Sequence, residues 1–239
     1  MSPLSGRQIV LAGGAGGIGS ECARALAAEG AQLVVSYRAN LERALRLQGI
    51  ATVVQADLTL PGDRRRLLDA APSIYGLVVF AGDPSRLQSP ADFEAVAHRS
   101  FEVNYAGPML LAREAAARMQ AAGAKGAIVL FSTMQAVALF PGSTAYAVPK
   151  AALIHGARLL AKEYRGPADI RVNVIAPGVT AAGMAEASIA AGKYNRYLEE
   201  GAISRFGRAA DLARAVRFFL EPDNFVTGQV LTVDGGLTL

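Results

Sequence analysis

The sequence has few of the residues that build metal sites, disulfides and histidine-based catalytic triads. Its 239 residues include one cysteine, two histidines and no tryptophan. A single cysteine excludes an internal disulfide, and one cysteine with two histidines is too few for an ordinary zinc site. We therefore expect chemistry that needs no metal ion and does not rely first on a histidine-based triad.

Long apolar runs and a strong excess of one charge are also lacking. No stretch of about 18 uninterrupted apolar residues occurs, and residues 1–6 lack the basic and apolar regions of a secretory signal. The 24 lysines and arginines against 20 acidic residues give a net charge of only +4. These absences predict a cytoplasmic protein with no membrane or nucleic-acid partner.

Short apolar runs alternate with longer helical patterns along the whole chain. The runs are rich in Val, Ile and Leu and lack polar alternation, as in parallel strands buried on both faces. The predicted strands are 9–12, 32–36, 52–55, 77–80, 127–131, 171–175 and 229–233. The predicted helices are 18–29, 41–47, 62–71, 90–122, 144–163 and 209–220.

This alternation predicts an α/β fold, with a doubly wound, seven-stranded parallel sheet of the Rossmann type between two layers of helices. We expect one dinucleotide-binding domain over 1–239. The segment 181–207 departs from the pattern, because it is long and rich in Ala, Gly and polar residues. Its position after the sixth strand favours a segment that covers the substrate, and the alternative is a surface excursion.

A glycine-rich loop joins the first predicted strand to the first predicted helix, where residues 11–19 read LAGGAGGIG. Glycines allow a tight turn and let backbone N–H groups approach a pyrophosphate at a helix N-terminus. Because the loop follows a strand and opens a helix, it predicts dinucleotide binding. The predicted contacts are Gly13, Ala15, Gly17 and Ile18.

The end of the second strand indicates which dinucleotide binds. Enzymes that use NAD place an acidic residue there for the ribose 2′-hydroxyl, but this strand ends in Arg38 and the next acid is Glu42. Arg38 can pair with a 2′-phosphate, so we expect NADP(H); the alternative is a solvated surface arginine. Asp57 and Leu58 follow the third predicted strand, where they either contact the adenine or form the turn before a helix.

Tyr146 and Lys150 are four residues apart at the start of a helical pattern and so share one face. A nearby ammonium and an oxidised nicotinamide lower the pKa of a tyrosine from its usual value of about 10. Ser132 and Thr133 end the preceding strand, and a hydroxyl there can polarise a carbonyl. The two hydroxyls point to opposite faces.

With these motifs in order, the sequence resembles the short-chain dehydrogenase/reductase family, of the compact single-domain kind, over almost its whole length. The glycine loop resembles the family's TGxxxGxG motif, Tyr146 and Lys150 match its YxxxK, and Asn104 matches the asparagine of its catalytic tetrad. Residues 171–178 and 226–236 resemble its RVN…PG stretch and C-terminal strand region. The family's remaining cofactor contacts fall on Ala81, Gly82, Tyr146, Lys150, Pro177, Gly178 and Val179.

The sequence departs from the family pattern at four places. Ala12 replaces a threonine of the glycine motif, and residues 79–82 read VFAG where the family has NNAG. The catalytic serine position, 13 residues before the tyrosine, holds Thr133, which keeps the hydroxyl. Pro149 lies between Tyr146 and Lys150, where it predicts a local helix distortion that leaves both side chains directed at the nicotinamide.

The resemblance implies an NADP(H)-dependent enzyme that reduces a ketone or oxidises a secondary alcohol, and a homotetramer. A 3-oxoacyl thioester is a compatible substrate, and Lys125 and Arg165 are candidates to meet an acidic acyl carrier protein. Two alternatives remain. One is a nucleotide-binding sensor or partner protein that has lost catalysis. The other, a methyltransferase, leaves the Tyr146–Lys150 pair unexplained.

Overall fold

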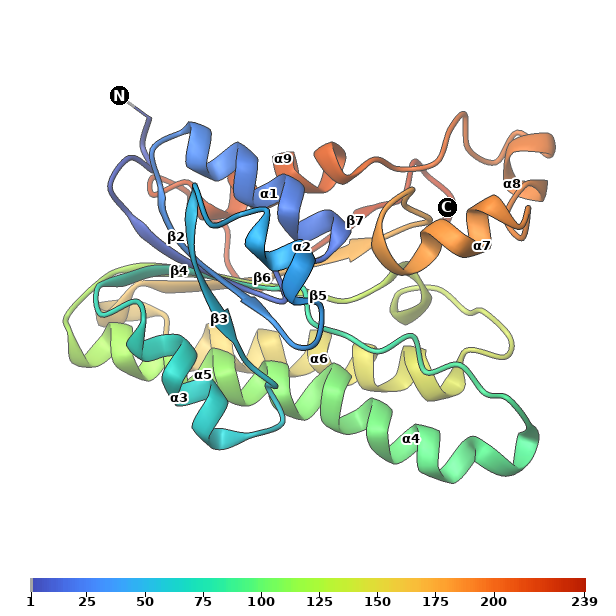
Figure 1. Cartoon of the computed structure of the whole chain (residues 1–239), viewed down its shortest axis with the longest axis horizontal. Coiled ribbons are helices and arrows are strands. Elements are labelled where there is room, and N and C mark those ends of the chain that lie inside the picture. The colour runs from blue at the N-terminus through green and yellow to red at the C-terminus, as the bar shows by residue number, and fades with distance from the viewer. Residues whose placement is uncertain (1) are drawn as a thin grey trace.

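A computed structural model of the chain, which describes residues 2–239, contains one sheet of seven parallel strands (Figure 1). In the sheet they follow the order β3-β2-β1-β4-β5-β6-β7. Each predicted apolar run overlaps one strand, and the predicted doubly wound α/β fold is confirmed. The strands are β1 Gln8–Ala12, β2 Gln32–Tyr37, β3 Ala51–Gln55, β4 Ile74–Val79, β5 Gly126–Phe131, β6 Ile170–Pro177 and β7 Val230–Val233.

Helices cover both faces of the sheet and create two apolar cores (Figure 1). Along β1, Val10 and Ala12 belong to one core and Ile9 and Leu11 to the other, which explains why the strands lack polar alternation. None of the described helices is long and apolar enough to cross a bilayer. One face carries α3 Pro61–Asp69, α4 Phe93–Phe101, α5 Gly107–Ala121 and α6 Thr144–Glu163, and the other carries α1 Gly17–Ala28, α2 Leu41–Leu45 and α9 Ala209–Leu220.

The strand order reverses at β1, which lies between β2 and β4. The chain therefore builds the sheet first to one side of β1 and then to the other. The carboxyl ends of parallel strands lie at one edge, and the loops that leave β1 and β4 diverge there. In open α/β sheets this crevice is where ligands bind.

The predicted helix over 90–122 is divided in the structure. A 3-10 turn at Pro90–Asp92 leads into α4, and a π-helical turn at Glu102–Ala106 separates α4 from α5. The π turn contains Asn104, which is fully buried. A π-helical turn holds one more residue than an α-helical turn, and this hardly changes the spacing of apolar residues. The sequence pattern therefore indicated a single helix.

The segment 181–207 contains two short helices that the sequence analysis did not predict, α7 Glu186–Ala190 and α8 Arg196–Glu199. Its base is closed by backbone hydrogen bonds: the Ala181 N–H donates to the Gly207 carbonyl at 2.8 Å, and the Gly207 N–H donates to the Val179 carbonyl at 2.9 Å. Both helices lie beyond the carboxyl edge of the sheet (Figure 1, orange). The segment is therefore an ordered excursion over that edge.

The turn from β1 into α1 should not tolerate a methyl group at Gly19. A Cβ there would lie 2.5 Å from Gly14 Cα and 2.7 Å from the Gly14 carbonyl oxygen, and backbone atoms cannot rotate away. We expect Gly19→Ala to lower the free energy of unfolding by about 1–3 kcal/mol, measured by urea denaturation. Gly62→Ala, in α3 with nothing within 4 Å of its Cβ, is the control and should leave stability equal or slightly higher. Equal midpoints for both variants would contradict the close packing.

Candidate active site

A cleft of about 1470 Å³ runs along the carboxyl ends of the strands. The loops that follow the strands form its wall, together with the start of α6 and part of the segment 181–207. The structure therefore brings together residues that are far apart in the sequence. Every predicted cofactor contact lies in this wall: Gly13, Ala15, Gly17, Ile18, Arg38, Asp57, Leu58, Ala81, Gly82, Tyr146, Lys150, Pro177, Gly178 and Val179.

The glycine loop brings backbone atoms closer together than side chains allow. Gly13 has a φ of +75°, and a Cβ on it would lie 2.9 Å from the Ala81 nitrogen. Its N–H donates to Ser36 Oγ at 2.9 Å, which fixes the loop to the end of β2. Helix α1 has Gly16 as N-cap with no side-chain cap, and its first-turn residues line the cleft. Their N–H groups are available to a phosphate, so the loop fits a pyrophosphate.

The far end of this wall is basic. Arg38 and Arg43 are exposed there, at the end of β2 and in α2. Asp57 is the single carboxylate in the cleft wall within residues 2–239, and its Oδ1 accepts hydrogen bonds from the Thr59 N–H at 2.9 Å and the Thr59 hydroxyl at 2.7 Å. The Asp57 carboxylate therefore supports the turn before α3.

Thr133, Tyr146 and Lys150 meet where β5 ends beside α6. Lys150 is 2% exposed, and its Nζ donates to the Phe131 carbonyl at 2.8 Å and to the Ala81 carbonyl at 3.5 Å. The Thr133 side chain lies beside Tyr146. Ser132 is turned to the helix and donates from Oγ to the Lys150 carbonyl at 2.9 Å. Of the two candidate hydroxyls, Thr133 is the one beside the tyrosine.

Helix α6 runs uninterrupted through Pro149. Proline lacks an N–H, so the helix forgoes only the hydrogen bond to the Ala145 carbonyl. The distortion expected from the sequence does not divide the helix, and both Tyr146 and Lys150 keep their places in the cleft wall.

Burial sets the protonation of the two titratable groups. It raises the pKa of Tyr146 to about 12, against the opposing hydrogen bond from Thr133 and with smaller contributions from the charges of Tyr194 and Asp83. It also lowers the pKa of Lys150 to about 8. We expect the Lys150 ammonium and an oxidised nicotinamide to lower the pKa of Tyr146 together; in the protein alone, desolvation of the phenolate outweighs any stabilisation by the ammonium. At neutral pH, Tyr146 carries a proton that it can donate.

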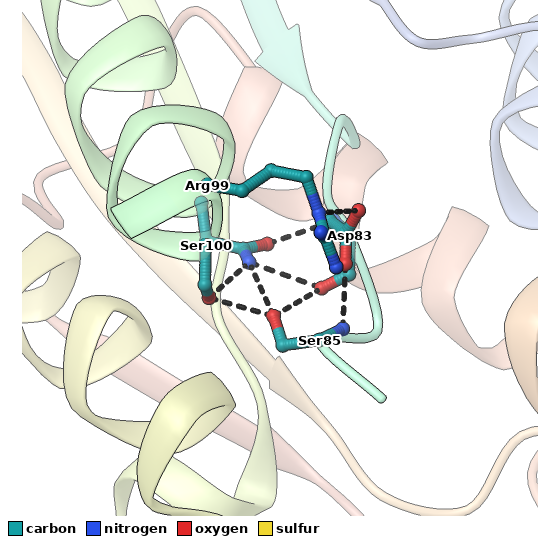
Figure 2. Close-up of polar contacts among 5 residues, drawn as sticks. Asp83, Ser85, Arg99 and Ser100 are labelled. Atoms are coloured by element: carbon teal, nitrogen blue, oxygen red, sulfur yellow. Dashed lines mark hydrogen bonds and ion pairs between the residues drawn. The ribbon is translucent and has the colours of Figure 1, made fainter. Parts of the chain in front are cut away.

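Asn104 lies behind the cleft wall, and its side chain fixes the loop that follows β4. Asp83 and Ser85 of this loop also bond to Arg99 and Ser100 of α4 (Figure 2). Its Nδ2 donates to the Asp83 carbonyl at 3.0 Å and to Ser100 Oγ at 2.9 Å, and its Oδ1 accepts from the Asp83 N–H at 3.0 Å. The Ser85 hydroxyl donates to Ser100 Oγ at 2.6 Å. A Cβ on Gly82 would lie 3.0 Å from Asn104 Oδ1 and 3.4 Å from Lys150 Nζ. Gly82 therefore lies between the side chains of Asn104 and Lys150, and its backbone is in contact with both.

The C-terminal motif supports the cleft from outside. A Cβ on Gly178 would lie 2.6 Å from Asp234 Cβ, and the Asp234 carboxylate accepts from the N–H groups of Gly236 and Thr238 at 2.9 and 3.0 Å. Asn173, in the middle of β6, donates to the Val226 carbonyl at 2.8 Å. The role of Asn173 here is to join β6 to the segment before β7.

Lys125 and Arg165 do not lie near the cleft. Lys125 precedes β5 and Arg165 precedes β6, so both are at the amino edge of the sheet. Lys125 pairs there with Asp169 at 2.7 Å. An acyl carrier protein that docked on these two residues would face the wrong edge, which corrects the expectation drawn from the sequence.

Sequence reasoning missed three residues of this site. Ser36 anchors Gly13, Arg43 joins Arg38 at the basic end, and Tyr194 of the segment 181–207 lines the cleft near Tyr146. The position of Arg43 five residues after Arg38 was a usable signal. Ser36 carried none, and Tyr194 lies in the segment 181–207 expected to cover the substrate but was not singled out, because the tertiary fold sets the contacts of both residues.

The chain is similar to known oxidoreductases over its full length. Residues 13–238 match the family model described as enoyl-(acyl carrier protein) reductase. An NADPH-dependent aldehyde reductase-like protein, chloroplastic, from Arabidopsis thaliana is 32% identical over 98% of this chain and 95% of its own length.

Two solved structures share the architecture. A short-chain type dehydrogenase/reductase from Mycobacterium ulcerans has a TM-score of 0.90, with 28% identity over 100% of this chain and 91% of its own. A 7α-hydroxysteroid dehydrogenase in complex with NADH and 7-oxo glycochenodeoxycholic acid has a TM-score of 0.87, with 31% identity over 98% and 94%. The match covers the sheet and all the loops that form the cleft.

The buried Lys150 should add to the stability of the protein as pH rises. Because its pKa is lowered to about 8 in the fold and is about 10.4 in an unfolded chain, this residue binds more protons in the unfolded state between pH 8 and 10. Lys150 therefore raises the free energy of unfolding over that window by up to about 1.4 kcal/mol per pH unit, against the opposite effect of the buried Cys22 thiol, whose pKa is raised to about 12. In urea titrations, Lys150→Met should lack this contribution and so lie below the wild-type slope, whereas Lys162→Met, an exposed lysine of the same helix, should keep the wild-type slope. The same slope in Lys150→Met as in the wild type would show that burial does not lower the pKa of Lys150.

Proposed function

The chain belongs to the short-chain dehydrogenase/reductase family, and from this premise we propose that it catalyses NADP(H)-dependent interconversion of a ketone and a secondary alcohol. The observation that carries the proposal is the grouping of Thr133, Tyr146 and Lys150 at the end of β5 and the start of α6. This grouping lies in the same cleft as the glycine loop.

The nicotinamide, when bound, supplies or accepts the hydride at the carbonyl carbon. In reduction, Tyr146 donates its phenolic proton to the substrate oxygen, and the Thr133 hydroxyl donates a hydrogen bond to the same oxygen. Lys150 would hold the ribose of a bound nicotinamide nucleotide and would pass protons toward Tyr146. Asn104 is a positioning residue, because its side chain hydrogen-bonds the backbone of Asp83, and the adjoining Gly82 lies against Lys150.

NADP(H) is the proposed cofactor because of the charge at the end of β2. Arg38 and Arg43 line that part of the cleft, and the Asp57 carboxylate accepts hydrogen bonds from Thr59 through Oδ1. A guanidinium pairs strongly with a phosphate and gains little from a ribose hydroxyl. The relative from Arabidopsis is named as NADPH-dependent, while the hydroxysteroid dehydrogenase structure holds NADH, so the choice rests on the residues of this chain.

The segment 181–207 is proposed as the part of this single domain that covers the substrate. Its residues Met184, Tyr194 and Tyr197 line the cleft together with the catalytic group. A Cβ on Gly17 would lie 2.6 Å from the Gly183 nitrogen, so the segment also touches the first turn of α1. This contact joins the cover of the substrate to the cofactor site.

A 3-oxoacyl thioester is one substrate that fits such a site, and the description of the matching family model favours thioester chemistry. A carrier protein would have to approach the carboxyl edge of the sheet, where the cleft opens. A homotetramer is the proposed assembly, supported by exposed apolar side chains on α4 and α5, Phe101 and Leu110, and on α9, Phe218.

Tyr146→Phe tests catalysis against simple nucleotide binding. Without the phenolic hydroxyl no proton reaches the substrate oxygen, so we expect turnover to fall by about 10²-fold or more while the Kd for NADPH changes less than threefold. Turnover is followed as NADPH oxidation against a panel of ketones and aldehydes, and Kd by NADPH fluorescence. Wild-type protein that binds NADPH but reduces nothing would instead support the sensor alternative.

Arg38→Gln tests the cofactor preference. Loss of the guanidinium should raise the Kd for NADPH about 10- to 100-fold, as expected for a charge-assisted hydrogen bond, and should leave the Kd for NADH nearly unchanged. Arg46→Gln, in the same region but bonded to Glu42 and outside the cleft wall, is the matched control. An equal loss for both cofactors in Arg38→Gln would show that Arg38 does not read the 2′-phosphate.

A further inference from the structure

The cleft has a second basic region, at the end that holds the catalytic group. Its wall contains six cationic side chains, of which Arg38 and Arg43 lie at the adenosine end and Lys150 is buried on backbone carbonyls. The other three, Arg86, Lys193 and Arg196, are exposed. They come from the loop after β4 and from the segment 181–207 (Figure 1). No step of the proposed reaction uses them.

Two tyrosines hold the cations of the segment 181–207 in place. The rings of Tyr194 and Tyr197 stack with centroids 6.3 Å apart and planes 12° apart. Lys193 Nζ lies 5.6 Å from the centre of the Tyr194 ring, and the Arg196 guanidinium lies 4.9 Å from that of Tyr197. Arg196 also donates to the Tyr197 hydroxyl at 3.1 Å. Cation–π contacts of this kind restrict where the positive charges can lie.

Arg86 is tied to the same segment from the opposite wall. Its Nη2 donates to the Met184 carbonyl at 3.2 Å. Arg86 also lies in the loop that follows Gly82, where a Cβ would lie 3.4 Å from Lys150 Nζ. The basic region is therefore at the end of the cleft that holds the catalytic group, away from Arg38.

The acidic residues of the segment 181–207 do not line the cleft. The Glu186 carboxylate accepts from the Gly183 N–H at 2.8 Å. Glu199 and Glu200 are exposed outside the cleft wall, and Arg205, a further cation of the segment, pairs with Asp211 at 2.7 Å. In the part of the chain that the structure describes, no carboxylate lines the cleft at this end. Asp83, in the loop before Arg86, is paired with Arg99 at 3.3 Å. The three exposed cations therefore have no carboxylate partner in the cleft wall.

We propose that the substrate of this enzyme is a carbonyl compound that carries an anionic group, a carboxylate or phosphate, which Lys193, Arg196 and Arg86 bind at the cleft mouth. The stacked tyrosine rings pack against the carbon skeleton between that group and the reacting carbonyl. Solvent in an open cleft weakens each ion pair between the substrate anion and a cationic side chain. Several cations around one anion offset that loss. The inference rests on the proposed ketone reduction and adds the substrate class.

The test compares matched charged and neutral ketones. One pair is 4-acetylbenzoate and its methyl ester, in which the carboxylate belongs to a small substrate. The other is acetoacetyl-coenzyme A and the neutral acetoacetyl thioester of N-acetylcysteamine, in which the charge belongs to phosphates of the carrier. We expect a kcat/KM at least tenfold higher for the anion in one pair, and which pair shows it identifies the source of the charge. For 4-acetylbenzoate, Kd for the NADP⁺-loaded protein, measured by calorimetry, provides a readout without turnover.

The variant K193Q/R196Q should bring the ratio of charged to neutral substrate toward one, in kcat/KM and in Kd. K125Q/R165Q removes the same net charge at the opposite edge of the sheet and should keep the wild-type ratio. This comparison separates binding of the anion by Lys193 and Arg196 from the long-range electrostatic effect of the protein's net charge. Equal use of charged and neutral substrates by the wild type overturns the inference, as does a ratio that K193Q/R196Q leaves unchanged. If NADPH binds but none of the four compounds is reduced, the proposed ketone reduction itself fails.

Discussion

The end of β5 and the helix α6 hold each other by two reciprocal hydrogen bonds. Lys150 Nζ donates to the Phe131 carbonyl at 2.8 Å, and Ser132 Oγ donates back to the Lys150 carbonyl at 2.9 Å. A buried ammonium is costly unless its hydrogen bonds are satisfied, so this pair fixes the register of the helix against the strand. That register places Thr133 against Tyr146, and the proposed proton donor depends on it.

The cofactor half of the cleft is built by a different constraint, which is close backbone approach. A Cβ on Gly13 would meet the Ala81 nitrogen at 2.9 Å, and one on Gly17 would meet the Gly183 nitrogen at 2.6 Å. The glycine loop therefore contacts both the end of β4 and the segment over the cleft. Because Gly82, next to Ala81, adjoins both Asn104 and Lys150, the cofactor half and the catalytic half meet at the end of β4.

Sequence patterns could predict the parts of this structure that depend on period and motif. The seven strands followed from apolar runs buried on both faces, and the cleft residues from Gly13 to Val179 followed from motif spacing and from the family resemblance. The π turn at Asn104, the helices α7 and α8 and the stacked Tyr194 and Tyr197 were not predictable, because tertiary contacts and not local periods specify them. The raised pKa of Tyr146 also escaped prediction, since it depends on burial.

A crystal structure of the protein with NADP⁺ would show whether one cleft joins a dinucleotide to Tyr146. We expect the pyrophosphate on the first turn of α1, the 2′-phosphate at Arg38, and the nicotinamide beside Tyr146 and Thr133. A dinucleotide bound outside this cleft, or a nicotinamide ring directed away from Tyr146, would contradict this expectation.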